Sequence, residues 1–220
     1  MPGTLDREVE LLKRIINYAV RCKKLQHNPI ASVPLLHVNN TRSSTLTSEK
    51  FDKLYAAAEA ELRPILLTAF DTGMRKEEIL NLRRQQVDLT NGIILLSAQD
   101  TKTGEPRIIV LTKQLKKMLD DLPRLISGYV FVNPKNGTRW KDIRKMFARA
   151  CAEAGLTGLW FHDLRRSFVT NARKSGVSES VVMRMSGHKS RNVFDRYNIV
   201  DIDDIKDAIE AIEKGMRKNG

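Results

Sequence analysis

Residues 92–111 read GIILLSAQDTKTGEPRIIVL, and this stretch decides between an all-helical and a mixed fold. Two apolar runs, 92–98 and 107–111, flank the turn-rich segment 99–106, a pattern typical of a β-hairpin. Residues 128–132, GYVFV, supply a third candidate strand, and the β signal is confined to this middle part of the chain. The sequence therefore predicts an α+β fold, mainly α-helical, with one small three-stranded antiparallel sheet.

Helical patterns lie on both sides of the hairpin. Apolar residues recur at helical spacing in the first of them, and Thr47 begins the second in a position suited to an N-cap. Gly73 separates two further helices, and Ser178 and Gly187 can cap the two ends of another. The predicted helices cover residues 5–23, 47–59, 63–71, 74–82, 141–155, 162–176, 178–186 and 202–213.

A linker is predicted between the first helix and the remainder. Residues 25–44 contain two prolines and end in a stretch rich in Asn, Ser and Thr, which is typical of a connecting segment. We expect a short helical segment at 1–28, a linker at 29–46 and one domain at 47–220.

Composition excludes several protein classes. The 220 residues are 41% hydrophobic and 29% charged, as in ordinary soluble proteins. No apolar run approaches the roughly 20 residues of a membrane span, and the start, MPGTLDREVE, lacks a signal-peptide pattern. Cys22 and Cys151 stand apart without metal-ligand spacing. These features favour a reducing, cytoplasmic setting and no membrane partner.

The distribution of charge indicates the class of partner. The formal net charge is +12, whereas residues 201–213 carry six acids and one lysine, a net of −5 that leaves +17 for the rest. A basic body of this size favours a polyanion, most simply nucleic acid. Ribosome binding, an anionic membrane surface and plain solubility remain open on charge alone.

The run Gly-His-Lys-Ser at 187–190 superficially suggests a phosphate-binding loop. Such a loop needs a lysine directly after its second glycine and another glycine five residues before it. His188 interrupts the first requirement and the preceding residues do not meet the second. A nucleotide site of this kind is therefore excluded, and the run is expected at the end of a helix.

Polar residues at four separate places could share a phosphate. Arg75 follows Gly73 at a helix start, but it could simply pair with Glu78 one turn later. Lys102 lies at the hairpin tip, where a lysine is usually just solvated. The other two places contain the candidates His162, Arg165, His188 and Tyr197.

His162 and Arg165 share a helix face because they are three residues apart, although a buried, hydrogen-bonded histidine is the simpler alternative. Tyr197 lies nine residues after His188. Each of these signals is weak when taken alone.

Taken together, four stretches resemble the tyrosine recombinases, the phage-integrase family of site-specific DNA recombinases. The stretches are TGMRKEE (72–78), TKTG (101–104), HDLRRSF (162–168) and SGHKSRNVFDRY (186–197). The resemblance spans about residues 45–200, the catalytic domain of that family. It fills the family pattern Arg, Lys, His-x-x-Arg, His and Tyr with Arg75, Lys102, His162, Arg165, His188 and Tyr197.

The resemblance also extends to the N-terminal stretch NYAVRCKKLQHNP, which looks like the end of the core-binding domain of the family. We therefore expect a catalytic domain with a remnant of that domain. Three positions depart from the family pattern. Ser186 stands where leucine is usual, and Phe194 and Ile199 stand where the family often has threonine and histidine.

The resemblance implies a mechanism on duplex DNA. Arg75 and Arg165 would hold the non-bridging phosphate oxygens with paired donors. His162 and His188 would add hydrogen bonds, with His162 the better acceptor of the tyrosine proton. Tyr197 would attack phosphorus to form a 3′-phosphotyrosine while Lys102 protonates the departing 5′ oxygen. The resemblance further implies assembly into a tetramer on DNA, with no cofactor and no metal ion.

Three alternative functions remain at this stage. A type IB topoisomerase uses similar groups, but the contexts HDLRR and GHKS favour recombination. A metal-dependent transposase needs clustered carboxylates, and the acidic residues here show no spacing that demands such a cluster. A DNA-binding protein without enzymatic activity would explain the charge but not the coexistence of the six polar positions.

Overall fold

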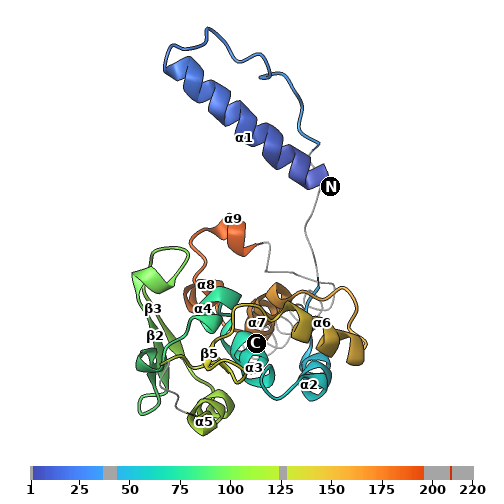
Figure 1. Ribbon diagram of the computed structural model, residues 1–220, viewed down its shortest axis with the longest axis vertical. Helices are drawn as coiled ribbons and strands as arrows, with labels where there is room; N and C mark the ends of the chain where they lie inside the picture. Colours follow the sequence, from blue (N-terminus) through green and yellow to red (C-terminus); the bar gives the residue numbers. More distant parts are fainter. Residues whose placement is uncertain (1, 37–43, 124–127, 196–208, 210–220) are drawn as a thin grey trace, which may run out of the picture. The chain divides into compact units, whose positions relative to one another are not determined.

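The computed structural model describes residues 2–36, 44–123, 128–195 and 209 (Figure 1). The chain divides into two compact units, Met1–Arg42 and Ser43–Gly220. The helix predicted at 202–213 lies, apart from residue 209, outside the described residues. No helix in the described ranges is both long enough and apolar enough to cross a membrane.

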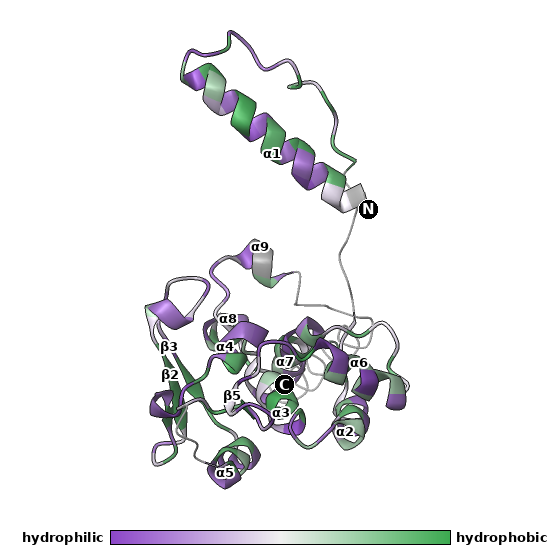
Figure 2. Ribbon diagram, viewed as in Figure 1, coloured by the Kyte–Doolittle hydropathy of each residue, from purple (hydrophilic) through white to green (hydrophobic). Residues whose placement is uncertain are grey.

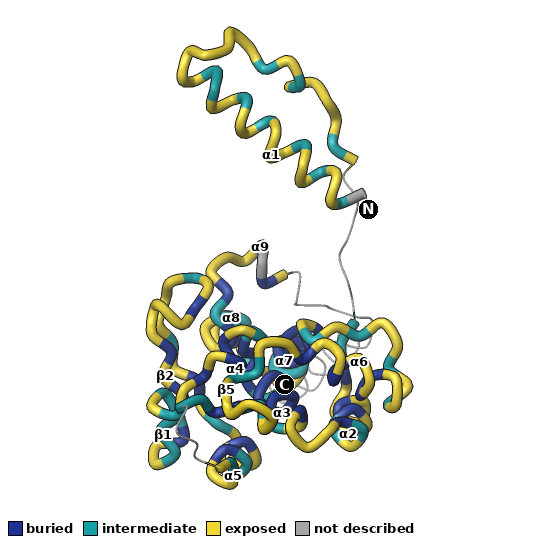
Figure 3. The backbone as a smooth tube through the Cα atoms, in the orientation of Figure 1, coloured by how far each residue is buried: buried dark blue, intermediate teal, exposed yellow. Residues whose placement is uncertain are grey.

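The first unit is a single helix with an irregular segment folded back along it. Helix α1 spans Pro2–Arg21, against a prediction of 5–23. Lys13 donates to the carbonyls of Val33 (2.6 Å) and Ala31 (3.0 Å), and the Leu36 amide donates to Asp6 (2.7 Å). Apolar and polar residues alternate around α1, and none of residues 3–36 is buried (Figures 2 and 3). The described part of this unit therefore has no hydrophobic core of its own.

The second unit is mainly helical, as predicted. Its helices are α2 (Ser48–Ala57), α3 (Arg63–Thr72), α4 (Lys76–Leu80), α5 (Lys113–Asp121), α6 (Arg144–Glu153), α7 (Phe161–Lys174), α8 (Glu179–Ser186) and α9 (Arg191–Phe194). Two short 3₁₀ turns, η1 (Arg84–Gln86) and η2 (Ala98–Asp100), flank the sheet strands. Helix α5 was not predicted, although Leu115 and Leu119 are spaced four residues apart and both are buried.

Three of the four predicted helix caps are confirmed. The hydroxyl of Thr47 accepts from the Lys50 amide (3.4 Å), as expected of an N-cap. Gly73 ends α3 with φ +62°, and Gly187 ends α8 with φ +72°, both in the left-handed conformation that glycine adopts without strain. Ser178 does occupy the N-cap of α8, but the prediction that its side chain caps the helix is wrong, because the hydroxyl contacts Ser180 instead (3.3 Å).

The predicted hairpin is confirmed. Strand β2 (Ile93–Leu96) pairs antiparallel with β3 (Arg107–Val110), with Ile94 opposite Ile109. Strand β1 (Val87–Asp88) pairs with the other edge of β2 and completes a three-stranded antiparallel sheet of order β1-β2-β3. The α+β fold class is therefore correct.

The identity of the third strand was predicted wrongly. Tyr129 makes only an isolated bridge to Arg83, and β4 (Val132–Asn133) pairs with β5 (Thr138–Arg139) in a separate two-stranded sheet. The consecutive residues Val130 and Phe131 are both about 4% exposed. The segment therefore packs into the core on both sides instead of presenting one face of a sheet.

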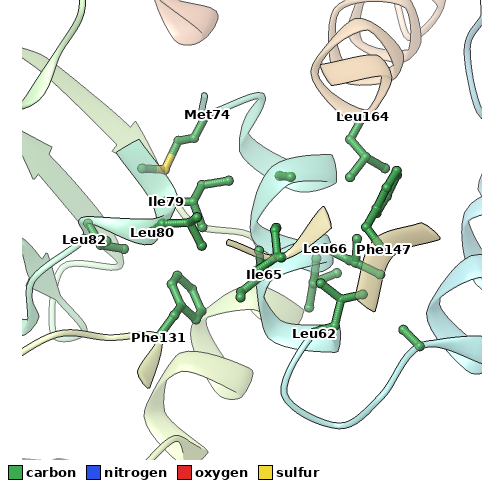
Figure 4. Packing of buried hydrophobic residues seen from close by; sticks show 14 of the residues in the cluster. Leu62, Ile65, Leu66, Met74, Ile79, Leu80, Leu82, Phe131, Phe147 and Leu164 are labelled. Atoms are coloured by element: carbon green, nitrogen blue, oxygen red, sulfur yellow. The ribbon is translucent and has the colours of Figure 1, made fainter. Parts of the chain in front are cut away.

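The core of the second unit surrounds α3. Ile65 and Leu66 of α3, both fully buried, lie among side chains from distant elements (Figure 4). Phe147 of α6 and Leu164 of α7 pack on one side, and apolar residues around α4 pack on the other (Figure 4). Helix α3 packs against α7, while α7 and β3 both pack against α8. These contacts bring the ends of α3, α7 and α8 together, with the hairpin beside them.

Candidate active site

Gly73 prepares the position of Arg75. It ends α3 in the left-handed conformation, and a Cβ at this position would lie 2.5 Å from the ring of Phe168 in α7. After this close approach Arg75 is extended (φ −72°, ψ 148°) at the N-cap of α4. The glycine thus both stops one helix and lets the backbone before Arg75 touch α7.

The guanidinium of Arg75 joins α4 to the Gly-His turn. Its Nη1 donates to Glu78 Oε1 (2.9 Å), so the pairing considered as the simpler alternative for Arg75 is present. Its Nη2 donates to the carbonyl of Gly187 (3.3 Å), 112 residues away along the chain. The side chain remains 20% exposed. Arg75 is therefore held at the site and is still accessible.

Arg165 is almost completely buried. The residue is only 2% exposed, on the inner side of α7. Its Nη1 donates to the carbonyl of Gly73 (2.7 Å), and its Nη2 lies 3.0 Å from His188 Nε2. Arg165 thus links the end of α3 to the end of α8.

His188 lies between a guanidinium and a hydroxyl. Since arginine can only donate, Nε2 facing Arg165 is the unprotonated nitrogen, and Nδ1–H donates to Ser186 Oγ (2.7 Å). The Ser186 hydroxyl in turn donates to the Val182 carbonyl (2.7 Å). Burial, together with the positive charges of Arg165 and Arg75, lowers the pKa of His188 to about 3. The ring is therefore neutral at pH 7.

His162 lies in the first turn of α7, three residues before Arg165, and it is more exposed than His188. Partial burial, followed by the positive charges of Arg165 and Arg166, lowers its pKa to about 4. A histidine with this pKa is neutral at pH 7 and can accept a proton. That state suits the role expected of His162, which stays a prediction.

A buried ion pair fixes the start of α7. Asp163, 1% exposed, accepts from Arg166 Nη1 (2.7 Å) and from the Trp160 amide (2.9 Å). The Ser167 hydroxyl donates to the Asp163 carbonyl (2.7 Å) and accepts from the Leu46 amide (2.7 Å). The first turns of the helix that carries His162 and Arg165 are therefore held by bonds within α7 and its N-cap and by the Leu46 amide of a distant segment.

Three residues of this site were not among the predicted site residues: Glu78 as a shared carboxylate, Arg107 and Ser186. Glu78 Oε2 accepts from Arg107 Nη2 (2.6 Å), and Arg107 Nη1 donates to the Ser186 carbonyl (2.7 Å). A signal for Arg107 exists in the sequence. The two-residue period of a strand places it on the same face as buried Ile109, where an arginine is unusual.

The structure brings together Arg75, Arg165, His162 and His188, all predicted, but not all six predicted residues. Lys102 lies exposed in the β2–β3 loop and, among the described residues, forms no ion pair or hydrogen bond with this cluster. Tyr197 lies outside the described residues. A groove between the hairpin and α8 is lined in part by Arg107, Gly187 and His188, so the cluster opens beside the loop that carries Lys102.

Acidic and metal-binding side chains do not cluster here. Within residues 2–36, 44–123, 128–195 and 209, no group of three His, Cys, Asp or Glu residues has the arrangement of a metal site. Cys22 is exposed and Cys151 is buried, and neither forms a disulfide. The chemistry that the cluster can perform with its own side chains is the binding of an anion by guanidiniums next to neutral histidines.

Comparison with known proteins identifies the same region. The model of the phage integrase family matches residues 44–203. The chain is 28% identical over 200 residues to the shufflon-specific DNA recombinase of Escherichia coli, covering 89% of this chain and 50% of that protein. It is 26% identical over 208 residues to the integrase of Salmonella phage P22, covering 89% and 53%. The chain therefore spans about half the length of these curated relatives.

Solved structures share the fold. An integrase of the Tn1549 transposon, in complex with a circular intermediate DNA, superposes with a TM-score of 0.76 over 95% of this chain and 79% of that one, at 17% identity. The XerA recombinase gives a TM-score of 0.67 over 90% and 72%, at 20% identity. A lambda integrase dimer bound to a COC′ core site gives 0.72 over 88% and 61%, at 20% identity.

Proposed function

The chain belongs to the phage integrase family, the tyrosine recombinases, and from this membership we propose that it cuts and rejoins duplex DNA through a 3′-phosphotyrosine intermediate. The observation that carries the proposal is the convergence of Arg75, Arg165 and His188 from three separate segments. Arg75 reaches the Gly187 carbonyl, and Arg165 reaches both Gly73 and His188. Paired guanidiniums of this kind recognise the non-bridging oxygens of a phosphodiester.

The neutral hydrogen-bond partners of these arginines are exchangeable. Each guanidinium uses one donor on a backbone carbonyl, and Arg165 uses another on a neutral imidazole. A phosphate oxygen carries negative charge and forms stronger hydrogen bonds with arginine than these neutral acceptors do. DNA binding would therefore redirect N–H groups from the Gly187 carbonyl and from His188 toward the phosphate, at the point where charge develops in the transition state.

The reaction that follows conserves the number of phosphoester bonds. The Tyr197 hydroxyl attacks phosphorus, the bond from phosphorus to the 5′ oxygen breaks, and the protein is joined to the 3′ phosphate. His162, which is neutral at pH 7, would accept the tyrosine proton. Lys102 would give a proton to the departing 5′ oxygen. Attack by a 5′ hydroxyl on the phosphotyrosine then reverses these steps, so rejoining needs no nucleotide cofactor.

His188 needs a change of tautomer to take part. In the free protein its Nε2 accepts from Arg165, so it has no proton to offer a phosphate. Once Arg165 turns to the phosphate, Nε2–H could donate, and the Ser186 hydroxyl could turn its own proton toward Nδ1. The hydroxyl suits both states because it can donate as well as accept.

The expected partners follow from the same proposal. The substrate would be double-stranded DNA, on which the protein would assemble as a tetramer so that two duplexes exchange strands, and its working compartment would be the cytoplasm. The two solved integrases described above are in complex with DNA. The size of the protein–DNA complex in sedimentation would test the assembly.

A nicked duplex tests the chemistry. With a nick just beyond the cleavage position, the short 5′ piece diffuses away after attack and a covalent complex accumulates. Candidate sites would come from DNA flanking the native gene. We expect the complex to form in EDTA, with the protein on the 3′ end. Tyr197→Phe should bind DNA equally well and trap nothing, because only the attacking oxygen is removed.

Tyr55→Phe, on α2, is the matched control and should trap as well as the wild type. A covalent adduct in Tyr197→Phe would place the nucleophile elsewhere. Relaxation of supercoiled DNA without site preference would instead support a topoisomerase. DNA binding without any adduct on any candidate site would favour a protein that only binds DNA.

A further inference from the structure

We propose that Arg107 is a positioning residue of this site, holding the base of the hairpin that carries Lys102 against the turn that carries His188. The inference rests on the proposed function, because it assigns Lys102 and His188 to one reaction. Arg107 is the first residue of β3, five residues after Lys102. None of its polar atoms is required to touch DNA for this role.

Two short bonds fix the guanidinium of Arg107. Its Nη1 donates to the Ser186 carbonyl (2.7 Å) and its Nη2 to Glu78 Oε2 (2.6 Å). The side chains of Arg107 and Glu78 are only 7% and 3% exposed, so water competes little for these bonds. A side chain of the hairpin is thereby tied to α4 and to the last residue of α8.

Gly187 makes room for this contact. A Cβ at position 187 would lie 2.1 Å from Arg107 Nη1 and 3.2 Å from its Cζ. The guanidinium therefore occupies the space of the missing side chain, directly beside the backbone that precedes His188. The backbone amides of Gly187 and His188 both donate to the Met183 carbonyl (2.8 and 3.0 Å). Any shift of Arg107 would change the environment of these two amides.

Glu78 also connects Arg107 to Arg75. Its Oε1 accepts from Arg75 and its Oε2 from Arg107, so one buried carboxylate serves two guanidiniums. If Arg107 were removed, the whole charge of Glu78 would act on Arg75. Arg75 would then bind a phosphate less well, because Glu78 would pair with Arg75 alone and neutralise more of its positive charge.

The loop between Thr101 and Arg107 is short and closed at both ends. The Thr101 hydroxyl donates to the Glu105 carbonyl (2.9 Å) and accepts from the Glu105 amide (3.1 Å). Lys102 lies inside this closed loop, which Arg107 anchors to the protein. Loss of the anchor would therefore change where the Lys102 ammonium can reach.

The test compares two leaving groups on the nicked duplex. One substrate has the natural 5′ oxygen, and the other has sulfur at that bridging position. A thiolate leaves without a proton donor, because thiols ionise near pH ~8.5. Lys102→Ala should slow cleavage of the oxygen substrate and have a much smaller effect with sulfur. This variant defines the signature of a missing or misplaced acid.

Arg107→Lys keeps the charge but loses the planar fork, so it should fold and yet misplace the loop. We expect it to slow cleavage of the oxygen substrate about ten- to a hundredfold, and to raise the ratio of sulfur to oxygen rates in the direction seen for Lys102→Ala. Glu105→Gln is the matched control. It weakens an exposed pair with Lys189 (3.1 Å) that spans the same two segments, and it should change the rates less than about twofold.

Amide hydrogen exchange provides a second readout that does not depend on cleavage. In Arg107→Lys we expect about tenfold faster exchange at Gly187, His188 and Glu105, with the amides of α6 unchanged. The proposal is overturned if Arg107→Lys matches the wild type in rates and exchange, or slows both substrates equally while exchange rises throughout the unit. Failure of the wild type to cleave either substrate would contradict the proposed function, and the exchange result would still decide whether Arg107 anchors the two segments.

Discussion

Ser186 supports the ring of His188 through a hydroxyl, at a position where the family resemblance leads one to expect leucine. Its Oγ accepts from His188 Nδ1–H and donates to the Val182 carbonyl, and the residue is fully buried. Ser186→Ala would leave the ring N–H without its acceptor, which costs about 1–3 kcal/mol for a buried donor. We expect the free energy of unfolding to fall by that amount.

Nuclear magnetic resonance of the imidazole nitrogens would check this result. The wild-type His188 should show a single tautomer with the proton on Nδ1, and Ser186→Ala should show averaged signals from a less restrained ring. Ser186→Thr keeps the hydroxyl and should keep the wild-type signals. Identical spectra for the wild type and Ser186→Ala would mean that the hydroxyl does not hold the ring.

The neutral state of His188 makes stability depend on pH. The folded pKa of about 3 lies below the ordinary value of 6.5, so between these values the unfolded chain binds a proton that the folded protein excludes. The contribution of the neutral ring to the free energy of unfolding is therefore complete above pH 6.5 and is lost as the pH falls toward 3. At pH 5 the loss should be roughly 2 kcal/mol. His162, with its pKa lowered to about 4, acts in the same direction.

Urea unfolding at several pH values would measure this dependence, with His188→Gln as the comparison. Glutamine has no proton to gain, so the variant should lose less stability between pH 7 and 5 than the wild type does. Equal pH dependence of the two proteins would show that His188 is not the group responsible.

At the scale of elements, the start of α7 depends on the buried pair of Asp163 and Arg166. Their side chains are 2% and 10% exposed, and Arg166→Met would leave the carboxylate buried without its cation. Breaking one side of such a pair costs about 3–5 kcal/mol. We therefore expect a large fall in the melting temperature and in DNA cleavage, because α7 carries both His162 and Arg165.

Arg144→Met provides a control of the same chemistry. Arg144 pairs with Asp142 at the same distance, 2.7 Å, but the two side chains are 82% and 48% exposed. An exposed pair contributes much less, because water screens both charges and the side chains lose freedom when they pair. Similar losses in the two variants would mean that burial does not decide the strength of the Asp163–Arg166 pair.

The elements also show which sequence signals suffice. The β2–β3 hairpin and the end of α3 at Gly73 were predicted correctly, because two apolar runs around a turn-rich segment and a left-handed glycine are local signals. The third strand was not, because GYVFV has the composition of a strand while two of its consecutive residues are drawn into the core. Only the tertiary packing distinguishes these two outcomes.

The same distinction holds for the site. His162 and Arg165 could be assigned to one helix face from their spacing, and the motif order joined them to Arg75 and His188. Ser186 was noted only as a departure from the family pattern, although its hydroxyl contacts His188 just two residues away. Arg107 was missed, since its role comes from bonds to α4 and to the end of α8, which lie 29 and 79 residues away along the chain. No local pattern encodes a contact of that range.

For the whole molecule, the excess of positive charge predicts how DNA binding responds to salt. The chain carries a formal net charge of +12, and each neutralised phosphate contributes a slope of about −0.9 to the dependence of log affinity on log salt. We expect weak, steeply salt-dependent binding to any duplex. Fluorescence anisotropy on unrelated sequences, between about 50 and 200 mM salt, would measure the slope. Tight binding to one sequence, with an affinity that does not change with salt concentration, would contradict this expectation.

The contact between Gly73 and Phe168 restricts how this protein can change over evolutionary time. The ring of Phe168 fills the space that a methyl group at position 73 would need. A substitution at either position alone therefore lowers stability by an amount that depends on the residue at the other position. The left-handed backbone at Gly73 adds a second penalty that no change at position 168 removes. Selection for new DNA targets should therefore leave both positions unchanged, while substitutions accumulate on exposed surfaces of the hairpin. Deep mutational scanning should show that positions 73 and 168 both tolerate few substitutions.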